Sequence, residues 1–406
     1  MKPERKKVLN MPNSKMIALG EHRSVIRDLF EYGMERKKIV GEDNVFDFSI
    51  GNPSIPAPEA VGKELVRLIE ETPPTALHGY SSAAGDPAVR RAVADYIRKT
   101  FGVNETPDDI YMTCGAAASL TISLHALLNE GDEVIVFAPF FPEYRVFIEK
   151  AGGVVKVVPA QGEDFAPDLD AFARTLSEKT RAVIVNSPNN PSGAVLSEET
   201  LNAIAGMMKK QSRLSGAPVW LIADEPYREL VYDGVTVPYP MRCYADTLVC
   251  YSFSKSLSLP GERIGYIALC HEAEDRDRVF AAICGAGRAL GFVCAPVLFQ
   301  KMIPALLGQT ADVSAYRKNR DLLYSSLVSY GYTCVRPRGA FYLFLKAPDG
   351  DDAAFGETCR KRDLLIVPAA GFGMPGWLRV SYCVSEKTIR GALPVFEKIA
   401  KEYGLK

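Results

Sequence analysis

Seven short runs of nearly all-apolar, β-branched residues follow one another between about residue 109 and residue 270. A strand buried on both faces reads as a continuous apolar run, which is typical of mostly parallel sheets covered by helices. Segments of helical character lie between several of these runs, and this alternation is typical of α/β proteins. The sequence therefore predicts an α/β fold with a mostly parallel, seven-stranded sheet flanked by helices. The runs are 109–115, 132–139, 153–160, 180–188, 217–226, 246–254 and 263–270, and the helical segments are 117–131, 143–153, 169–179 and 197–213.

The last two runs are joined by a stretch too short for a helical crossover, which predicts an antiparallel neighbour at this point. The final hundred residues change character and predict a smaller α+β unit, because helical segments at 314–332 and 385–404 enclose two strand-like runs at 339–347 and 377–384. A helix over 21–41 has no place in the sheet and is expected to pack on this unit. We therefore expect three parts, since single cores stop growing near ~250–300 residues. They are an N-terminal segment 1–47, a large domain 48–304 and a small domain 305–406.

Charge and cysteine usage exclude several classes of protein. Lys and Arg total 48 against 49 Asp and Glu, so neither a nucleic acid nor an anionic membrane is an expected partner. The chain shows no signal peptide and no apolar run approaching ~18 residues, which favours a cytoplasmic protein. Nine cysteines never form a C-x-x-C pair and the four histidines are not closely spaced. We therefore expect free thiols and no metal site.

Polar residues follow the predicted strands at the edge where open α/β sheets bind their ligands. The first strand runs into Gly115 and then a helix, so the N–H groups of Ala116 and Ala117 are available to a phosphate. Later strand ends supply an amide, a carboxylate, a phenol, hydroxyls, an amine and a guanidinium. These groups belong to Asn190, Asp224, Tyr227, Ser252, Ser254, Lys255 and Arg263.

This inventory is the one that pyridoxal phosphate requires. Its aldehyde needs a lysine, and its ring nitrogen needs a carboxylate that keeps it protonated. Its phosphate needs an arginine, hydroxyls and backbone amides. Each residue also has an ordinary structural explanation, since Lys255 could lie on a solvated turn and Asp224 could cap a helix. The set as a whole favours the cofactor.

The motif SFSKSLSLPGERIG (252–265) is similar to the lysine signature of class I/II aminotransferases, the aspartate aminotransferase group of pyridoxal-phosphate fold type I. SPNNPSG (187–193) and DEPY (224–227) resemble the other two internal motifs of that family, in the same order and spacing. Four further stretches extend the similarity over nearly the whole chain. They are 79–94, 139–144, 336–344 and 378–383.

The resemblance implies a role for each matched residue. Lys255 is similar to the lysine that forms the internal aldimine and then moves a proton between the substrate Cα and the cofactor C4′. Asp224 would hold the ring nitrogen, and Tyr227 and Asn190 would donate to O3′. The phosphate would be bound by the backbone at Ala116 and Ala117 and by Ser252, Ser254 and Arg263.

The resemblance also implies residues around the substrate and a second subunit. Phe141 would stack on the cofactor ring. Arg379 would bind the substrate α-carboxylate, assisted by Gly51 and Asn190. Tyr80 would reach the phosphate of the neighbouring subunit, which implies a homodimer with shared active sites.

The expected activity is the transfer of an amino group between an L-amino acid and a 2-oxo acid, with pyridoxamine phosphate as intermediate. A C–S β-lyase, an aminocyclopropanecarboxylate synthase-like enzyme or an amino-acid decarboxylase would use similar motifs. A ligand-sensing regulator on this fold is less favoured, because only a short segment precedes residue 46 and the net charge is -1. Arg288 is a candidate for binding a distal substrate carboxylate, while its apolar neighbours would equally suit alanine or aromatic substrates.

Overall fold

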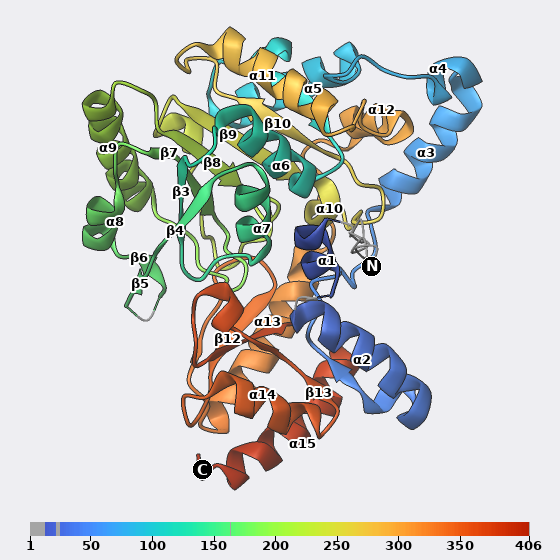
Figure 1. Ribbon diagram of the computed structural model, residues 1–406. Coiled ribbons are helices and arrows are strands. Elements are labelled where there is room, and N and C mark those ends of the chain that lie inside the picture. Colours follow the sequence, from blue (N-terminus) through green and yellow to red (C-terminus); the bar gives the residue numbers. More distant parts are fainter. Residues whose placement is uncertain (1–12, 22–24, 163, 406) are drawn as a thin grey trace, which may run out of the picture.

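The computed structural model describes residues 13–21, 25–162 and 164–405, and it is built around a seven-stranded sheet (Figure 1). β10 runs antiparallel to both of its neighbours, β2 and β9, and every other neighbouring pair is parallel. The mostly parallel seven-stranded sheet and the antiparallel neighbour after the sixth run are therefore confirmed. In spatial order the strands are β2 (Ile110–Thr113), β10 (Gly265–Leu269), β9 (Thr247–Ser252), β8 (Trp220–Asp224), β7 (Thr180–Asn186), β3 (Glu133–Phe137) and β4 (Val154–Val158).

Burial differs between the strands of the sheet. Every residue of β8, β9 and β10 is buried, because helices such as α6 (Ala116–Leu127) pack across them. β4 lies at the edge, and its Val154 and Val157 are exposed. The expectation that all seven runs are buried on both faces is wrong for this strand. Its edge position alone is not the reason, because β2 lies at the other edge and is buried at all of its residues, so β4 is the strand whose faces are covered less completely.

Helices enclose the large sheet, and α11 packs on α6 (Figure 1). α5 begins at Pro87 because Asp86 caps it by accepting a bond from Ala88 N, and it ends at Gly102, whose φ of 68° few other residues adopt. The remaining elements of this unit are α3 (Glu59–Glu71), α4 (Pro74–His78), α5 (Pro87–Phe101), η2 (Pro107–Asp109), α7 (Glu143–Lys150), β5 (Ala160–Gln161), β6 (Ala166–Pro167), α8 (Leu169–Thr175), α9 (Glu198–Ser215), η3 (Pro240–Arg242), α10 (Phe253–Ser256), α11 (Arg276–Ala289) and α12 (Val297–Leu306).

A second, smaller unit holds a four-stranded antiparallel sheet in the order β11-β12-β15-β14. β1 and β13 form a separate parallel pair. These short strands escape sequence analysis because two residues carry no periodic signal. The elements are η1 (Glu42–Asn44), β1 (Phe46–Asp47), α13 (Val313–Ser329), β11 (Cys334–Val335), β12 (Tyr342–Lys346), α14 (Asp352–Arg360), β13 (Leu364–Leu365), β14 (Val367–Pro368), η4 (Ala370–Phe372), β15 (Trp377–Ser381) and α15 (Glu386–Glu402).

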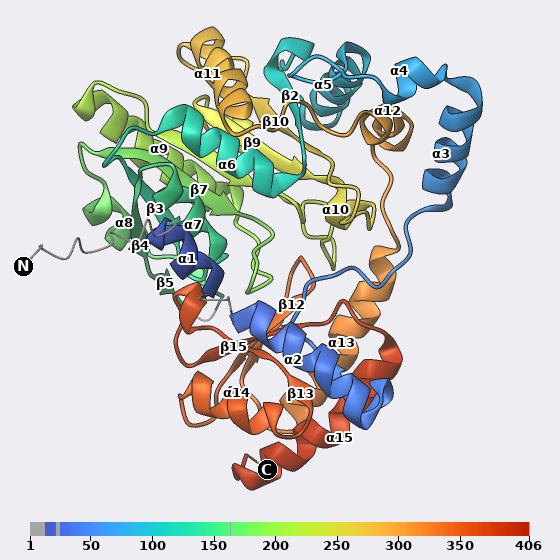
Figure 2. The same ribbon diagram turned by 45° about the vertical axis from the view of Figure 1, so that its right-hand side comes forward.

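The helix predicted over 21–41 corresponds to α2 (Val25–Val40), and a short helix that was not predicted, α1 (Ser14–Glu21), precedes it. α2 lies along the smaller unit (Figure 2), where Leu29 packs with residues of β13 and β14 and Arg36 forms an ion pair with Asp363. Residues 1–12 and 22–24 of the predicted N-terminal segment lie outside the described residues, and the boundaries after residues 47 and 304 stay predictions. Among the described residues, no helix is both long enough and apolar enough to cross a membrane.

Candidate active site

A cavity of about 300 Å³ opens where the carboxyl ends of β7, β8 and β9 face the smaller unit. In both ribbon views α10, the turn that follows β9, lies on this side of the sheet (Figures 1 and 2). The cavity brings together residues predicted from five separate strand ends and from the smaller unit. Those predicted residues are Gly51, Ala116, Ala117, Phe141, Asn190, Asp224, Tyr227, Ser252, Ser254, Lys255, Arg263 and Arg379.

Lys255 lies on α10, whose start is capped by Ser252 Oγ accepting a 3.2 Å bond from Ser254 N. Its Nζ donates to the Gly51 carbonyl at 2.6 Å and lies 5.4 Å from the centre of the Phe341 ring. Burial lowers the pKa of Lys255 to about 8, and the nearby Arg263 and Arg379 guanidinium groups also lower it, against an opposing effect of Cys383. A fraction of this amine is therefore neutral near physiological pH and able to act as a nucleophile or base.

Asp224 ends β8 and is 5% exposed. Its Oδ2 accepts a hydrogen bond of 2.5 Å from the Tyr144 hydroxyl, and Asn186 Nδ2 lies 3.5 Å from the same oxygen. Its Oδ1 is buried and has no hydrogen-bond partner among the described residues. Burial raises the pKa of Asp224 to about 7, and the bond from Tyr144 opposes that rise. A buried oxygen without a donor is costly, and a protonated ring nitrogen in the cavity would supply one.

An anion cradle lies beside Lys255. Arg263 Nη1 donates to Ser254 Oγ at 3.3 Å, and the hydroxyls of Ser252 and Ser254 lie 2.7 Å apart. The first N–H groups of α6, at Ala116 and Ala117, line the same cavity and have no acceptor within their helix. Gly115 precedes them with a φ of 85°, and a Cβ there would lie 2.7 Å from Arg263 Nη2. Hydroxyls, a guanidinium and a helix N-terminus together fit a phosphate.

Arg379 of β15 is a buried cation, 2% exposed, and it forms no ion pair within the part of the chain that the structure describes. Its Nη1 donates to Asn190 Oδ1 at 3.0 Å and its Nη2 to the Ser49 carbonyl at 2.5 Å, while its Nε has no partner among those residues. Burial lowers the pKa of the guanidinium. A carboxylate entering the cavity would compensate this charge in the planar fork that arginine offers.

Two tyrosines close the cavity beside Arg379. Tyr227 and Tyr342 share a hydrogen bond of 2.8 Å between their hydroxyls. A Cβ at Gly51 would lie 2.1 Å from the Tyr342 hydroxyl oxygen, so glycine is required at this position. The Gly51 carbonyl is already used by Lys255, which leaves its N–H as the group that could contact a substrate carboxylate.

Two predicted residues do not line the cavity. Tyr80 is 89% exposed in this single chain, and Arg288 is exposed on α11. Their predicted roles both involve a neighbouring subunit or a distal substrate group, and they stay predictions. Phe141 does line the cavity and packs edge-on against Tyr144, with ring centres 5.7 Å apart.

Several residues that complete the site were not predicted from the sequence. Tyr144 and Tyr342 both lie within stretches that carried the family resemblance, 139–144 and 336–344, so the motif was present although the role was not assigned. The others are Ile26, Ile50, Leu120, Pro226 and Pro260, which line the cavity, and Asn186, which holds Asp224.

Comparisons with known proteins agree with this geometry. Residues 43–396 match the family described as "Aminotransferase class I and II". The aspartate/prephenate aminotransferase of Thermus thermophilus is 33% identical, over 86% of this chain and 89% of that protein. The aspartate aminotransferase of Thermotoga maritima is 32% identical, over 88% of this chain and 91% of that protein.

Solved structures are similar over nearly the whole chain. An amino transferase from Eubacterium rectale is 53% identical, with a TM-score of 0.95 over 97% of this chain and 99% of that one. The Thermus thermophilus aspartate aminotransferase structure with maleate is 28% identical, with a TM-score of 0.86 over 96% of this chain and 100% of that one.

Proposed function

Because this chain belongs to the class I and II aminotransferases, we propose that the cavity beside Lys255 is its active site and that Lys255 is its catalytic amine. The protein is a pyridoxal-phosphate-dependent aminotransferase of fold type I. The observation that carries the site assignment is the unpaired oxygen of buried Asp224, which faces the same cavity as the amine of Lys255.

The polar groups that line the cavity support a role for each of these residues in binding the cofactor. When bound, pyridoxal phosphate supplies an electron-withdrawing ring that stabilises the charge left when a proton leaves the substrate Cα. Asp224 would keep the ring nitrogen protonated, and Tyr227 and Asn190 Nδ2 would donate to O3′. Phe141 would cover one face of the ring. The phosphate would be held by Ser252, Ser254, Arg263 and the N–H groups of Ala116 and Ala117.

The substrate would be oriented by Arg379 and its proton moved by Lys255. Arg379 binds the α-carboxylate with its guanidinium fork, aided by the Gly51 N–H and Asn190, and so fixes the position of Cα. Lys255 Nζ would take the Cα proton as a general base and deliver it as a general acid to the cofactor atom C4′, and the lowered pKa of Lys255 suits both roles.

The proposal also covers the substrates, the oligomeric state and the cellular location of the protein, in less detail. The reaction exchanges an amino group between an amino acid and a 2-oxo acid, as the names of the relatives indicate for those proteins. We expect a homodimer with shared active sites, since Tyr80 is exposed and does not line the cavity of its own chain. A cytoplasmic location and the absence of nucleic-acid or membrane partners rest on composition and on the lack of a membrane-spanning helix among the described residues.

The purified enzyme tests this function when it is mixed with an amino acid and 2-oxoglutarate. Transfer yields glutamate and the matching oxo acid in equal amounts. Release of pyruvate with ammonia or hydrogen sulfide would instead identify a C–S lyase, and release of carbon dioxide a decarboxylase. Two observations separate transfer from the two alternatives. The rate of transfer depends on both substrates, and the amino acid alone gives no more than one turnover per site.

A further inference from the structure

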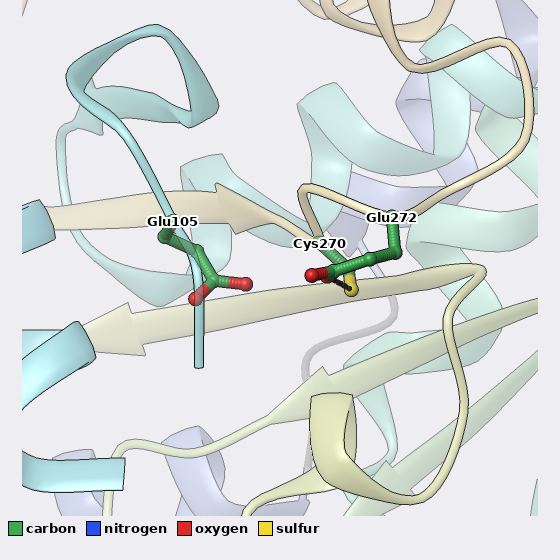
Figure 3. A group of neighbouring side chains, drawn as sticks. All are labelled: Glu105, Cys270 and Glu272. Atoms are coloured by element: carbon green, nitrogen blue, oxygen red, sulfur yellow. Dashed lines mark hydrogen bonds between the residues drawn. The ribbon is translucent and has the colours of Figure 1, made fainter. Parts of the chain in front are cut away.

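Three potential metal ligands meet at the end of the large sheet opposite to the active-site cavity. Glu105 lies between α5 and η2, Cys270 directly follows β10, and Glu272 lies two residues further. Cys270 N bonds to Thr247 O at the start of β9, whereas the cavity lies at the end of that strand. One ligand atom from each of the three side chains lies within 4.8 Å of the other two (Figure 3).

Glu105 is the feature of this cluster that no structural role accounts for. It is 0% exposed, and neither of its carboxylate oxygens has a hydrogen-bond partner among the described residues. The N–H groups of Glu105 and His271 lie near this carboxylate but outside hydrogen-bonding geometry. Buried carboxylates are normally paired with a cation or with several donors. The carboxylates of Glu105 and Glu272 point toward one another (Figure 3).

The other members of the cluster are held in place. Cys270 is buried, and its thiol donates to Glu272 Oε2 at 3.4 Å. Asn104 Nδ2 donates to Glu272 Oε1 at 2.6 Å. Glu272 is exposed, so an ion from solvent could reach the group through it. An oriented outer partner such as Asn104 is typical of ligating carboxylates.

The nearby basic side chains contact Asp109 instead of this cluster. His271 Nδ1 lies 2.9 Å from Asp109 Oδ2, and Arg276 Nε lies 2.5 Å from Asp109 Oδ1. Within the described residues, no ion pair involves Glu105. The cluster therefore combines two carboxylates and one thiol without a protein cation to balance them.

We propose that Glu105, Cys270 and Glu272 bind a divalent cation of the zinc type. Zn²⁺ accepts mixed sulfur and carboxylate ligands with bonds of about 2.0–2.3 Å, which separates neighbouring ligand atoms by roughly 3.5 Å. The three side chains need only a small contraction to reach that spacing. Mg²⁺ and Ca²⁺ prefer oxygen ligands alone. A water would complete the four-coordinate site.

The expectation of no metal site, drawn from the absence of closely spaced cysteines and histidines, is revised by this proposal. The ligands are separated by 165 positions along the sequence and meet only because β10 runs beside β2. A cation here would connect the segment before β2 to the turn after β10. Its role is structural and independent of the aminotransferase chemistry.

The proposal is tested by measuring metal binding to the holoenzyme. The enzyme is first treated with a chelator, and the chelator is then removed. We expect one tightly bound Zn²⁺ per chain by titration calorimetry, a higher Tm with Zn²⁺ than without it, and no comparable rise with Mg²⁺. Co²⁺ should bind with a sulfur-to-metal charge-transfer band that depends on Cys270. The Glu272→Gln and Cys270→Ser variants should each weaken Zn²⁺ binding by at least about tenfold.

The Glu274→Gln variant is the matched control, because Glu274 lies on the same turn, and it should bind Zn²⁺ like the parent protein. Equal affinity in Glu272→Gln and in the control would overturn the assignment by placing the ion elsewhere. An unchanged Tm and no heat of binding in the parent protein would overturn it as well and leave Glu105 as a buried protonated acid. A response to Mg²⁺ equal to that for Zn²⁺ would refute the thiolate ligand. Because Glu272 is exposed, its substitution does not threaten folding.

Discussion

Tyr144 donates a hydrogen bond of 2.5 Å to Asp224, although the two residues are 80 positions apart. The bond joins α7, which follows β3, to the end of β8, so it ties two strands of the sheet at the edge where the cavity lies. It occupies one carboxylate oxygen and leaves the other for a ligand. We therefore propose that Tyr144 is a positioning residue, which would act on the bound cofactor through Asp224.

The Tyr144→Phe variant should shift the pH dependence of the reaction. Burial raises the pKa of Asp224 to about 7, and the Tyr144 bond lowers it, so loss of the bond should raise it further. More Asp224 would then be protonated at neutral pH, and kcat/KM should fall by roughly tenfold, as expected for a lost charged hydrogen bond. The acidic limb of the pH–rate profile should move to higher pH. The Tyr244→Phe variant removes another buried hydroxyl, bonded to Val219 O, and should leave the profile unchanged.

The stability of the cofactor-free protein should fall as pH rises toward 7. Folded Asp224 keeps its proton up to about pH 7, whereas the unfolded chain releases it near pH ~4. The folded state therefore binds the extra proton between these values, and the free energy of unfolding decreases with pH in that window by up to about 4 kcal/mol. Urea denaturation of the apoprotein across the window measures this slope. The Asp224→Asn variant should show a flatter slope, and identical slopes would contradict the raised pKa.

The Lys255→Ala variant should lose transamination and the visible absorption that the bound cofactor gives in the parent enzyme. The rate should fall by about 10²–10⁴-fold or more, because both a nucleophile and a general base are removed. Absorption spectra and glutamate formation report the two effects separately. Lys346→Ala, at an exposed position on β12, serves as the control. Retained turnover in the Lys255→Ala protein would remove Lys255 from the mechanism.

The Arg379→Lys variant should lose substrate binding while it keeps the cofactor spectrum. Lysine retains the charge but not the two-pronged contact with a carboxylate, nor the donation to both Asn190 and Ser49. We expect kcat/KM for amino acids to fall by roughly 10²-fold, about 3 kcal/mol, mainly through KM. Arg390→Lys, on the exposed face of α15, should have no effect. An unchanged KM would show that another group binds the α-carboxylate.

The sequence could predict the large sheet and most of the cavity because both depend on local signals. Each strand is a continuous apolar run, and residues such as Asp224 and Lys255 sit at the point where such a run ends. The roles of Tyr144 and Tyr342 could not be predicted in this way, since each depends on a contact between elements far apart in the chain. The partial exposure of β4 could not be predicted either, because an apolar run does not reveal how completely other segments cover the faces of a strand.

Because β10 runs antiparallel to β2 and β9, it begins at the edge of the sheet where those strands end and ends at the edge where they begin. Arg263 precedes it at the anion cradle, and Cys270 follows it at the acidic cluster. A deletion or insertion within its five residues would slip the pairing with β2 and β9 and turn alternate side chains to the wrong side. The length of β10 is therefore expected to tolerate no change. Loss of a single residue would displace both Arg263 before the strand and Cys270 after it.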